Sequence, residues 1–378
     1  MSQAGFGIYV HWPFCAAKCP YCDFNSHVRS TLDDAAWARA IVRELEHMAA
    51  LQGETRPLVR TIFFGGGTPS LMGGAAAGEV LNAIARLWPM ANDVEVTLEA
   101  NPASAEAARF ADYRAAGVNR ISLGVQALND ADLKFLGRLH NVAEAKAALK
   151  LAMQTFERVS LDLIYARPGQ SSRGWEAELK EALGFGTEHL SLYQLTIEPQ
   201  TPFATRGIAV PDDDQAVALY ELTQELTEAA GRPAYEISNH AAPGAECRHN
   251  LIYWRYGDYV GVGPGAHGRL NIHGKRLATL CERLPERWQD KVRREGHGIA
   301  ETAEISPAEA AREHLLMGLR LREGIDLDAY RARWRTAPDA ERTAALVGAG
   351  FLIQTGTRLA ATPAGRLVLN RLIAELAP

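Results

Sequence analysis

The sequence predicts an α/β protein: an incomplete parallel barrel of six strand–helix units, followed by a smaller helical domain. Three observations predict this fold. Short apolar segments alternate with amphipathic segments over the first 200 residues, glycines and polar residues recur directly after the apolar segments, and helices around one hairpin follow from about residue 300. Strand–helix alternation is typical of a parallel sheet with helical crossovers. Six units indicate a partial (β/α)6 barrel of the TIM type, and a doubly wound open sheet is the alternative.

The predicted strands are apolar segments rich in Val, Ile, Leu and aromatic residues, bounded by Gly, Pro and Asn. They cover Gly7–Trp12, Arg60–Phe64, Asp93–Glu99, Arg120–Val125, Arg158–Ile164 and His189–Thr196. Helical periodicity lies between them, at Leu32–Leu51, Ala75–Leu87, Ala105–Ala116, Asp130–Met153 and Gly174–Phe185. A further helix starts in the acidic segment after Pro211 and runs to about Ala230, because acidic side chains favour helix N-termini.

Glycines and polar residues follow the ends of five of these strands. They lie at Gly65–Pro69, Asn101–Pro102, Gln126, Arg167–Gln170 and Glu198–Pro199. Ligands of barrels and of open α/β sheets bind at the carboxyl ends of the strands. We therefore expect one site that several loops build together.

The C-terminal region has a different pattern. Predicted helices at Ser306–Leu321, Leu327–Arg335 and Asp339–Ala349 precede a hairpin at Phe351–Ala360 and a last helix at Ala364–Leu376. This order resembles a winged-helix arrangement. We expect three units: a barrel over residues 1–205, a barrel extension and connecting segment over residues 206–300, and a winged-helix-like domain over residues 301–378.

The composition of the 378-residue chain narrows the classes of function. Its net charge of −5 gives no basic excess to neutralise phosphates, so we expect no nucleic-acid partner. No stretch of about 18 apolar residues predicts a transmembrane segment, and the first residues lack the features of a signal peptide. The five cysteines are an odd number, and three of them lie within eight residues. That clustering favours a metal site in a reducing compartment, so we expect a cytoplasmic protein.

Cys15, Cys19 and Cys22 form a C-x3-C-x2-C motif directly after the first predicted strand. Thiolates suit iron–sulfur clusters and zinc. A cubane cluster usually takes four cysteines, so three of them leave one iron open for a small molecule. The alternatives are a structural zinc site completed by His11 or His27, and a redox dithiol of Cys19 and Cys22. Structural zinc sites usually pair two such motifs, and a dithiol would leave Cys15 without a role.

This motif is similar to the defining motif of the radical S-adenosylmethionine (radical SAM) superfamily. The GGGTP sequence at Gly65–Pro69 resembles the glycine motif of that superfamily. The resemblance implies a [4Fe–4S] cluster on the three cysteines, with S-adenosylmethionine at the open iron. It also implies a set of residues that surround S-adenosylmethionine. These are Tyr9, Tyr21, Gly66, Gly67, Thr68, Glu99, Gln126, Arg138 and Asp162.

The residue types suit these implied roles. Glycines at positions 66 and 67 let backbone groups approach a ligand closely. Glu99 and Asp162 can accept hydrogen bonds from ribose hydroxyls or from the ammonium group, and Arg138 can pair with the carboxylate. Arg138 falls within the predicted helix Asp130–Met153. The sequence assigns no catalytic residue.

Further segments resemble one branch of the superfamily, which contains oxygen-independent coproporphyrinogen III dehydrogenases and haem chaperones. They are Tyr9–Cys15, Leu98–Pro102, Gly124–Gln126 and Asp162–Tyr165. The dehydrogenases have a further cysteine where this chain has Phe24, and a longer segment before their cysteines. Both differences favour the haem-chaperone side of the branch, as does the sequence from Cys19 to His27.

The segment Cys247–Trp254 resembles the H-N-x-x-Y-W motif of that side of the branch, which is associated with haem binding. Histidine is a common haem ligand, and Tyr and Trp supply flat faces for a porphyrin. The resemblance implies His249 as the haem ligand; a Cys247 thiolate, or a purely structural histidine, are the alternatives. The tract Gly261–His267 is either a loop that closes over the cofactor site or a run of turns. Cys281 receives no role.

The implied function is that of a haem chaperone, which binds haem at a place separate from S-adenosylmethionine and delivers it to haemoproteins. Membrane-associated respiratory enzymes are candidate recipients, and an electron donor would reduce the cluster. The alternative is an enzyme that decarboxylates coproporphyrinogen III oxidatively to protoporphyrinogen IX, or a radical SAM enzyme for another substrate.

Overall fold

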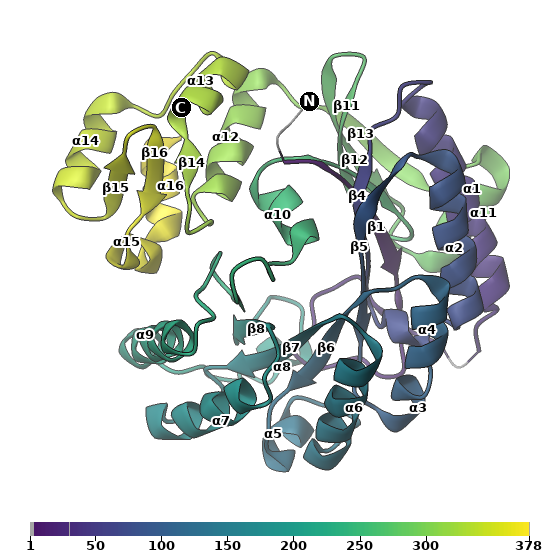
Figure 1. The fold of residues 1–378 in the computed structure, drawn as a ribbon, viewed down its shortest axis with the longest axis horizontal. Helices are drawn as coiled ribbons and strands as arrows, with labels where there is room; N and C mark the ends of the chain where they lie inside the picture. The colour runs from purple at the N-terminus through teal and green to yellow at the C-terminus, as the bar shows by residue number, and fades with distance from the viewer. Residues whose placement is uncertain (1–3, 30, 378) are drawn as a thin grey trace.

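The computed structural model describes residues 4–29 and 31–377 of the chain (Figure 1). An eleven-stranded sheet organises most of it, with the strand order β13-β12-β11-β10-β1-β4-β5-β6-β7-β8-β9. These strands are β1 (Phe6–Trp12), β4 (Val59–Gly66), β5 (Met90–Ala100), β6 (Arg120–Gln126), β7 (Arg158–Tyr165), β8 (His189–Gln194), β9 (Asn239–Ala241), β10 (Asp258–Val262), β11 (His267–Ile272), β12 (Lys275–Cys281) and β13 (Ile299–Glu304).

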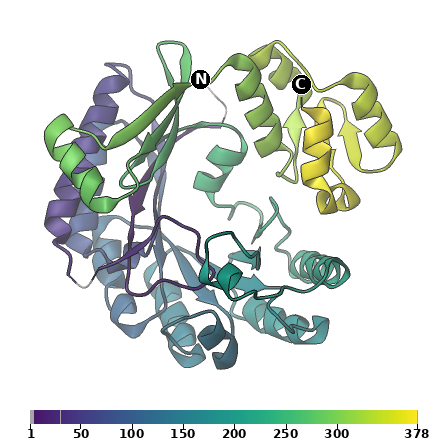
Figure 2. The same cartoon turned by 180° about the vertical axis from the view of Figure 1, so that it is seen from behind.

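Six of the strands, β1 and β4 to β8, are parallel and neighbour one another in chain order, which confirms the predicted sheet. The connecting helices lie on its outer side (Figures 1 and 2). They are α1 (Asp34–Leu51), the 3-10 turn Pro69–Leu71, α2 (Gly74–Leu87), α3 (Ser104–Ala107), α4 (Phe110–Ala116), α5 (Asp130–Phe135), α6 (Val142–Thr155) and α7 (Ser172–Gly184). As the structure describes them, β9 and β13 form the two ends of the sheet, so the barrel is incomplete.

One predicted helix is wrong in a way that affects the site. The segment expected to be a single helix, Asp130–Met153, is two helices, α5 and α6, with a turn between them. The turn forms because Gly137 has a φ of 69° and because Asn141 caps α6 in a reciprocal capping box with Glu144. Arg138 therefore lies in this turn and not on a helix. The predicted helix Ala105–Ala116 is likewise divided, into α3 and α4.

The sheet extends beyond the predicted strands. β10 pairs in parallel with β1, and the antiparallel strands β11, β12 and β13 follow it. No strand was predicted in this region, and Gly261–His267 was expected to be either a loop over the cofactor site or a run of turns. Its hairpin has a two-residue connection, because Ile272 pairs with Lys275 across the His273–Gly274 turn. The extension places Gly261–His267 beside the first strand of the barrel.

The C-terminal unit has the predicted winged-helix-like arrangement. Three strands, in the order β14-β16-β15, pack with the surrounding helices around a separate apolar core that includes Leu315, Tyr330, Leu359 and Leu372. Its elements are α12 (Pro307–Gly318), β14 (Ile325–Asp326), α13 (Leu327–Trp334), α14 (Ala340–Gly348), β15 (Leu352–Thr355), β16 (Arg358–Ala361), α15 (Pro363–Leu367) and α16 (Leu369–Leu376).

A short helix, α10 (Arg248–Trp254), lies on the inner side of the sheet, between the sheet and the C-terminal unit, in both views (Figures 1 and 2). It contacts β1, β4, β10 and α12. The remaining helices are α8 (Pro202–Thr205), α9 (Asp213–Ala229) and α11 (Pro285–Glu295). Among the residues that the structure describes, no helix combines the length and the apolar character needed to cross a membrane.

Candidate cofactor site

The three clustered cysteines lie in a loop that directly follows β1. Phe14–Cys15 (β2) pairs in parallel with His27–Val28 (β3), so the two ends of the loop lie side by side. Within it, the backbone N–H of Cys22 donates to the carbonyl oxygen of Cys19 at 3.1 Å. All three cysteines are free thiols; Cys15 is buried, whereas Cys19 and Cys22 are half-buried.

The glycine tract after β4 is bonded to this cysteine segment. The N–H of Gly67 donates to the carbonyl of Trp12 at 2.7 Å, and the N–H of Thr68 donates to the carbonyl of Phe14 at 2.8 Å. The Thr68 hydroxyl donates to Cys15 Sγ at 3.3 Å. A Cβ atom on Gly67 would lie 2.8 Å from the Phe14 carbonyl oxygen, so only glycine allows this approach. The tract thus fixes the position of Cys15.

Arg138 reaches the second cysteine from the turn between α5 and α6. Its guanidinium donates to Cys19 Sγ at 3.4 Å, to the carbonyl of Gly124 at 3.0 Å, and to the side-chain oxygen of Asn101. Its buried Nε has no partner among the described residues. Asn101 in turn donates to the Thr68 hydroxyl at 3.2 Å. N–H groups aimed at cysteine sulfurs stabilise thiolates and tune iron–sulfur clusters.

Two carboxyl groups, Glu99 on β5 and Asp162 on β7, face the same space. Burial, together with the charge of Asp162, raises the pKa of Glu99 to about 8. Burial also raises the pKa of Asp162, although its carboxylate accepts hydrogen bonds from the hydroxyls of Ser122 (2.9 Å) and Ser160 (3.1 Å). Two carboxyl groups held in this way suit hydrogen bonding to hydroxyl or ammonium groups of a ligand.

The other predicted residues complete the surroundings. The Tyr9 hydroxyl lies 3.0 Å from His11 Nδ1, and burial lowers the pKa of His11 to about 4, so that its ring is neutral. Burial raises the pKa of Tyr21. Gln126 has a φ of 73° at a register shift of β6, a conformation that costs energy for a residue other than glycine.

All the residues predicted for the site line one cavity of about 500 Å³. They are Tyr9, Cys15, Cys19, Tyr21, Cys22, Gly66, Gly67, Thr68, Glu99, Gln126, Arg138, Asp162 and His249. The predicted convergence of loops at the carboxyl ends of the strands therefore occurs. His249 lines the same cavity as the three cysteines, whereas haem was expected to bind apart from S-adenosylmethionine.

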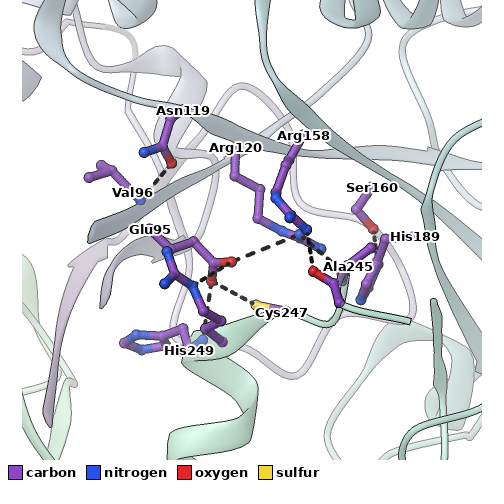
Figure 3. Close-up of polar contacts among 12 residues, drawn as sticks. Glu95, Val96, Asn119, Arg120, Arg158, Ser160, His189, Ala245, Cys247 and His249 are labelled. Carbon is purple, nitrogen blue, oxygen red and sulfur yellow. Dashed lines mark hydrogen bonds and ion pairs between the residues drawn. The ribbon is translucent and has the colours of Figure 1, made fainter. Parts of the chain in front are cut away.

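The helix that carries His249 is held to the sheet by a buried charge network (Figure 3). Glu95 on β5 accepts from the backbone N–H of His249 at 3.2 Å and from Cys247 Sγ at 3.7 Å. Its other oxygen lies 4.0 Å from the Arg120 guanidinium, and both side chains are almost fully buried. Burial raises the pKa of Cys247 to about 12, so this residue is a neutral thiol.

The imidazole of His249 is wholly buried and has a partner at each nitrogen. Nδ1 lies 2.8 Å from the Thr61 hydroxyl, and Nε2 lies 2.7 Å from the Tyr253 hydroxyl. The ring also stacks on Phe63. Burial lowers the pKa of His249 to about 3, so the ring is neutral at physiological pH.

The residues of the cysteine loop fit a cluster. Three thiols line one cavity, two of them accept a hydrogen bond from a neighbouring side chain, and the Nε of Arg138 lacks a partner in the described part of the chain. Within residues 4–29 and 31–377, no three His, Cys, Asp or Glu side chains gather closely enough to hold a single ion. A cubane does not require such a group, because each of its thiolates binds a different iron.

Comparison with known proteins agrees with this arrangement. Residues 9–182 match the radical SAM superfamily, and residues 305–368 match the HemN C-terminal domain. The chain is 39% identical to heme chaperone HemW of Escherichia coli (strain K12), over 97% of this chain and 96% of that protein. The chain belongs to the HemW family.

Two further relatives also match over most of this chain. Heme chaperone HemW of Mycobacterium tuberculosis (strain ATCC 25618 / H37Rv) is 37% identical, over 98% of this chain and 94% of that protein. Radical S-adenosyl methionine domain-containing protein 1, mitochondrial, of Bos taurus is 41% identical, over 84% and 74%. The solved structure of coproporphyrinogen III oxidase (HemN) from Escherichia coli has a TM-score of 0.83, covers 99% of this chain and 90% of that chain, and is 21% identical, which shows a shared fold. Radical SAM membership implies a [4Fe–4S] cluster and S-adenosylmethionine.

Two residues that organise the site in this HemW-family chain had not been predicted. They are Glu95 and Arg120, which attach α10 to the sheet. Asn101 was predicted at a strand end without a role, and it links Arg138 to Thr68. A signal for Glu95 was present. Glu95, Thr97 and Glu99 alternate along β5, and alternate residues of a strand face the same side.

Proposed function

We propose that this chain is a haem chaperone that binds a [4Fe–4S] cluster, S-adenosylmethionine and haem, and delivers haem to haemoproteins. The observation that carries the proposal is the H-N-x-x-Y-W segment of α10, which adjoins the cysteine cavity in a chain 39% identical to a heme chaperone HemW. We also propose the division into residues 1–205, 206–300 and 301–378; the match of residues 305–368 to the HemN C-terminal domain supports the last unit.

The proposed cluster ligands are Cys15, Cys19 and Cys22. When bound, the cluster supplies an open iron for a chelating ligand and an electron for one-electron chemistry. The chain's own residues bind and orient S-adenosylmethionine. Arg138 is proposed to pair with its carboxylate, and Glu99 and Asp162 to accept hydrogen bonds from it. The remaining proposed contacts are Tyr9, Tyr21, Gly66, Gly67, Thr68 and Gln126.

The haem ligand proposed from the motif is His249, with Cys247 as the alternative. The neutral ring of His249 suits a metal ligand. To bind iron it would have to release the Tyr253 hydroxyl from Nε2 or the Thr61 hydroxyl from Nδ1. Cys247 would have to lose a proton against its raised pKa, next to the carboxylate of Glu95.

The proposed setting is the cytoplasm, with an electron donor for the cluster and with haemoproteins as recipients, including membrane-associated respiratory enzymes. The absence of a long apolar helix in the described residues is consistent with delivery by transient contact. Pull-down of recipient haemoproteins by haem-loaded chain, compared with haem-free chain, tests this part. Recovery that does not depend on haem would contradict it.

The cluster is tested by anaerobic reconstitution with iron and sulfide, followed by EPR spectroscopy of the reduced protein with and without S-adenosylmethionine. We expect a cubane signal that changes when S-adenosylmethionine is added. Cys15→Ala, Cys19→Ala and Cys22→Ala should each lose the signal, and Cys281→Ala, which removes a cysteine outside the cavity, should keep it. Bound zinc, or protein without inorganic sulfide, would refute the cluster assignment.

The enzyme alternative is tested on the same reconstituted protein. Phe24 stands at the position where the dehydrogenases have a further cysteine, and its side chain is 61% exposed. Anaerobic incubation with coproporphyrinogen III and S-adenosylmethionine should leave the substrate unchanged, while haemin added to the apo-protein should develop a Soret band. Formation of protoporphyrinogen IX would favour the dehydrogenase instead.

A further inference from the structure

A second, larger cavity of about 910 Å³ lies against the first one. Strands β10 to β12, helix α10 and helix α12 of the C-terminal unit supply half of its lining residues. The two cavities share Tyr9, Phe24, Gly66, Glu99 and Tyr253 in their walls. The volume is at the upper end of the range of roughly 300–1,000 Å³ that ligand pockets have.

The wall of this second cavity suits a flat, largely apolar ligand. Trp254, Tyr256 and Tyr259 line it, together with the apolar side chains of Leu316 and Met317. Aromatic faces of this kind pack against planar rings. The indole Nε1 of Trp254 is buried and has no acceptor among the described residues. This N–H could therefore donate a hydrogen bond to a ligand.

Three arginines line the cavity, and they differ in whether they are paired. Arg269 and Arg276 line it, but each is already paired, with Glu313 at 3.1 Å and with Asp258 at 2.5 Å. Arg283 also lines the cavity, is exposed, and has no side-chain hydrogen bond or ion pair within the described residues. A free guanidinium at the mouth of an apolar cavity suits a carboxylate of the ligand.

Only one histidine of the two cavities has free ring nitrogens in the described structure. His11, His189 and His249 each have a hydrogen-bond partner at both ring nitrogens. His267, at the start of β11, is exposed as a residue, and its ring has no such partner. Partial burial of the ring and the neighbouring Arg269 and Arg283 lower its pKa, which favours the neutral imidazole that binds metals.

We propose that haem occupies this second cavity, with His267 as a ligand of the iron and Arg283 as a partner of one propionate. The inference rests on the proposed haem-chaperone function and names the site for it. His249 then has a structural role in the shared wall: through Tyr253 it orients an aromatic side chain that both cavities contact. The proposal differs from the H-N-x-x-Y-W assignment in the histidine that ligates iron.

The test is a haemin titration of apo-protein followed at the Soret band. His267→Asn should weaken binding by about tenfold or more and move the band, because an iron ligand is lost. The matched control is His273→Asn, an exposed histidine on the turn of the same hairpin that lies outside the cavity, and it should bind like wild type. Circular dichroism and thermal unfolding of each variant show that the fold is kept.

Arg283 gives an independent measurement. Arg283→Gln should weaken haemin binding by about tenfold, the scale of a hydrogen bond to a charged group. It should not change the binding of haemin dimethyl ester, whose propionates carry no charge. Equal losses for both ligands would contradict the propionate contact.

The outcomes separate the two proposals. If wild type develops no Soret band, the haem-chaperone function itself fails. If wild type binds haemin, and His267→Asn binds it with the same affinity and band position, the second cavity is refuted as the site. Loss of the band in folded His249→Ala alone would assign the iron to the first cavity and overturn the inference.

Discussion

The buried carboxylate of Glu95 accepts a hydrogen bond from the backbone N–H of His249 at 3.2 Å, across 154 positions of sequence. The same carboxylate faces the Arg120 guanidinium at 4.0 Å and the Cys247 thiol at 3.7 Å (Figure 3). Glu95 thus helps to attach helix α10 to the inner side of the barrel, together with the ion pair of Arg248 with Asp93 on β5 at 2.8 Å. A buried charge of this kind is stable only while its partners are in place.

Removing that charge should destabilise the protein. Glu95→Gln preserves the shape of the side chain but leaves Arg120 buried without a counter-ion, which typically costs about 3–5 kcal/mol. Urea unfolding should show the loss as a lower midpoint. Glu301→Gln, at an exposed position of β13, is the matched control and should stay within about 0.5 kcal/mol of wild type. An equally small change in Glu95→Gln would show that α10 is held by other contacts.

The glycine tract should be required for cluster assembly. In Gly67→Ala the new Cβ would meet the backbone of Pro13 and Phe14 at 2.8 Å and displace the strand that presents Cys15. We expect less iron and sulfide per chain after reconstitution. Gly184→Ala, at the end of α7 where a Cβ meets nothing within 4 Å, should assemble the cluster fully. Normal iron content in Gly67→Ala would mean that the cysteine loop adapts to the clash.

Arg138 should contribute to the binding of S-adenosylmethionine rather than to the fold or to the cluster content. Arg138→Lys keeps the positive charge but loses the planar fork that reaches Cys19, Asn101 and Gly124 together. We expect cluster content to be kept and the affinity for S-adenosylmethionine, measured by EPR titration, to fall by about tenfold or more. Arg114→Lys, in an exposed ion pair with Glu157, should change neither quantity. An unchanged titration for Arg138→Lys would remove the arginine from the binding site.

The apo-protein should lose stability as Glu99 ionises. The pKa of Glu99 is about 8 in the folded protein, against a reference value of 4.5. The folded state therefore binds the proton more tightly than the unfolded state does. The free energy of unfolding falls as the pH rises from the reference pKa to the folded pKa, and this stabilisation is fully lost above the folded pKa. Each pKa unit corresponds to about 1.4 kcal/mol. Glu99→Gln, compared with wild type by denaturant unfolding below and above this pH range, should become relatively more stable at high pH. A pH-independent difference would contradict the shift.

Much of the barrel could be predicted from the sequence, because the strands of a buried parallel sheet are short apolar segments between breakers. The six parallel strands and their order follow from that pattern. The antiparallel strands β11 to β13 were missed because polar and charged residues occupy much of them. In β13, for example, only Ile299 is buried. Helical periodicity continues on both sides of Arg138, and the positive φ of Gly137 that breaks it is a backbone property with no periodic signal.

The site was predictable where it depends on local motifs. The cysteine loop and GGGTP tract are contiguous in sequence, and the structure brings them together as expected. Glu95 and Arg120 were not predicted, because a charged residue inside a strand ordinarily signals a solvent-facing position. Their burial depends on α10 covering them, and this contact joins segments far apart in sequence.

The shared wall of the two cavities has a thermodynamic consequence. Molecules in the two spaces would contact the same side chains of Tyr9, Glu99 and Tyr253, so their binding free energies are coupled. Coupling of this kind is reciprocal, because each ligand changes the affinity of the protein for the other ligand by the same factor. Binding of haem in one cavity and of S-adenosylmethionine in the other would then be linked equilibria. A change in the affinity for one ligand would change the affinity for the other.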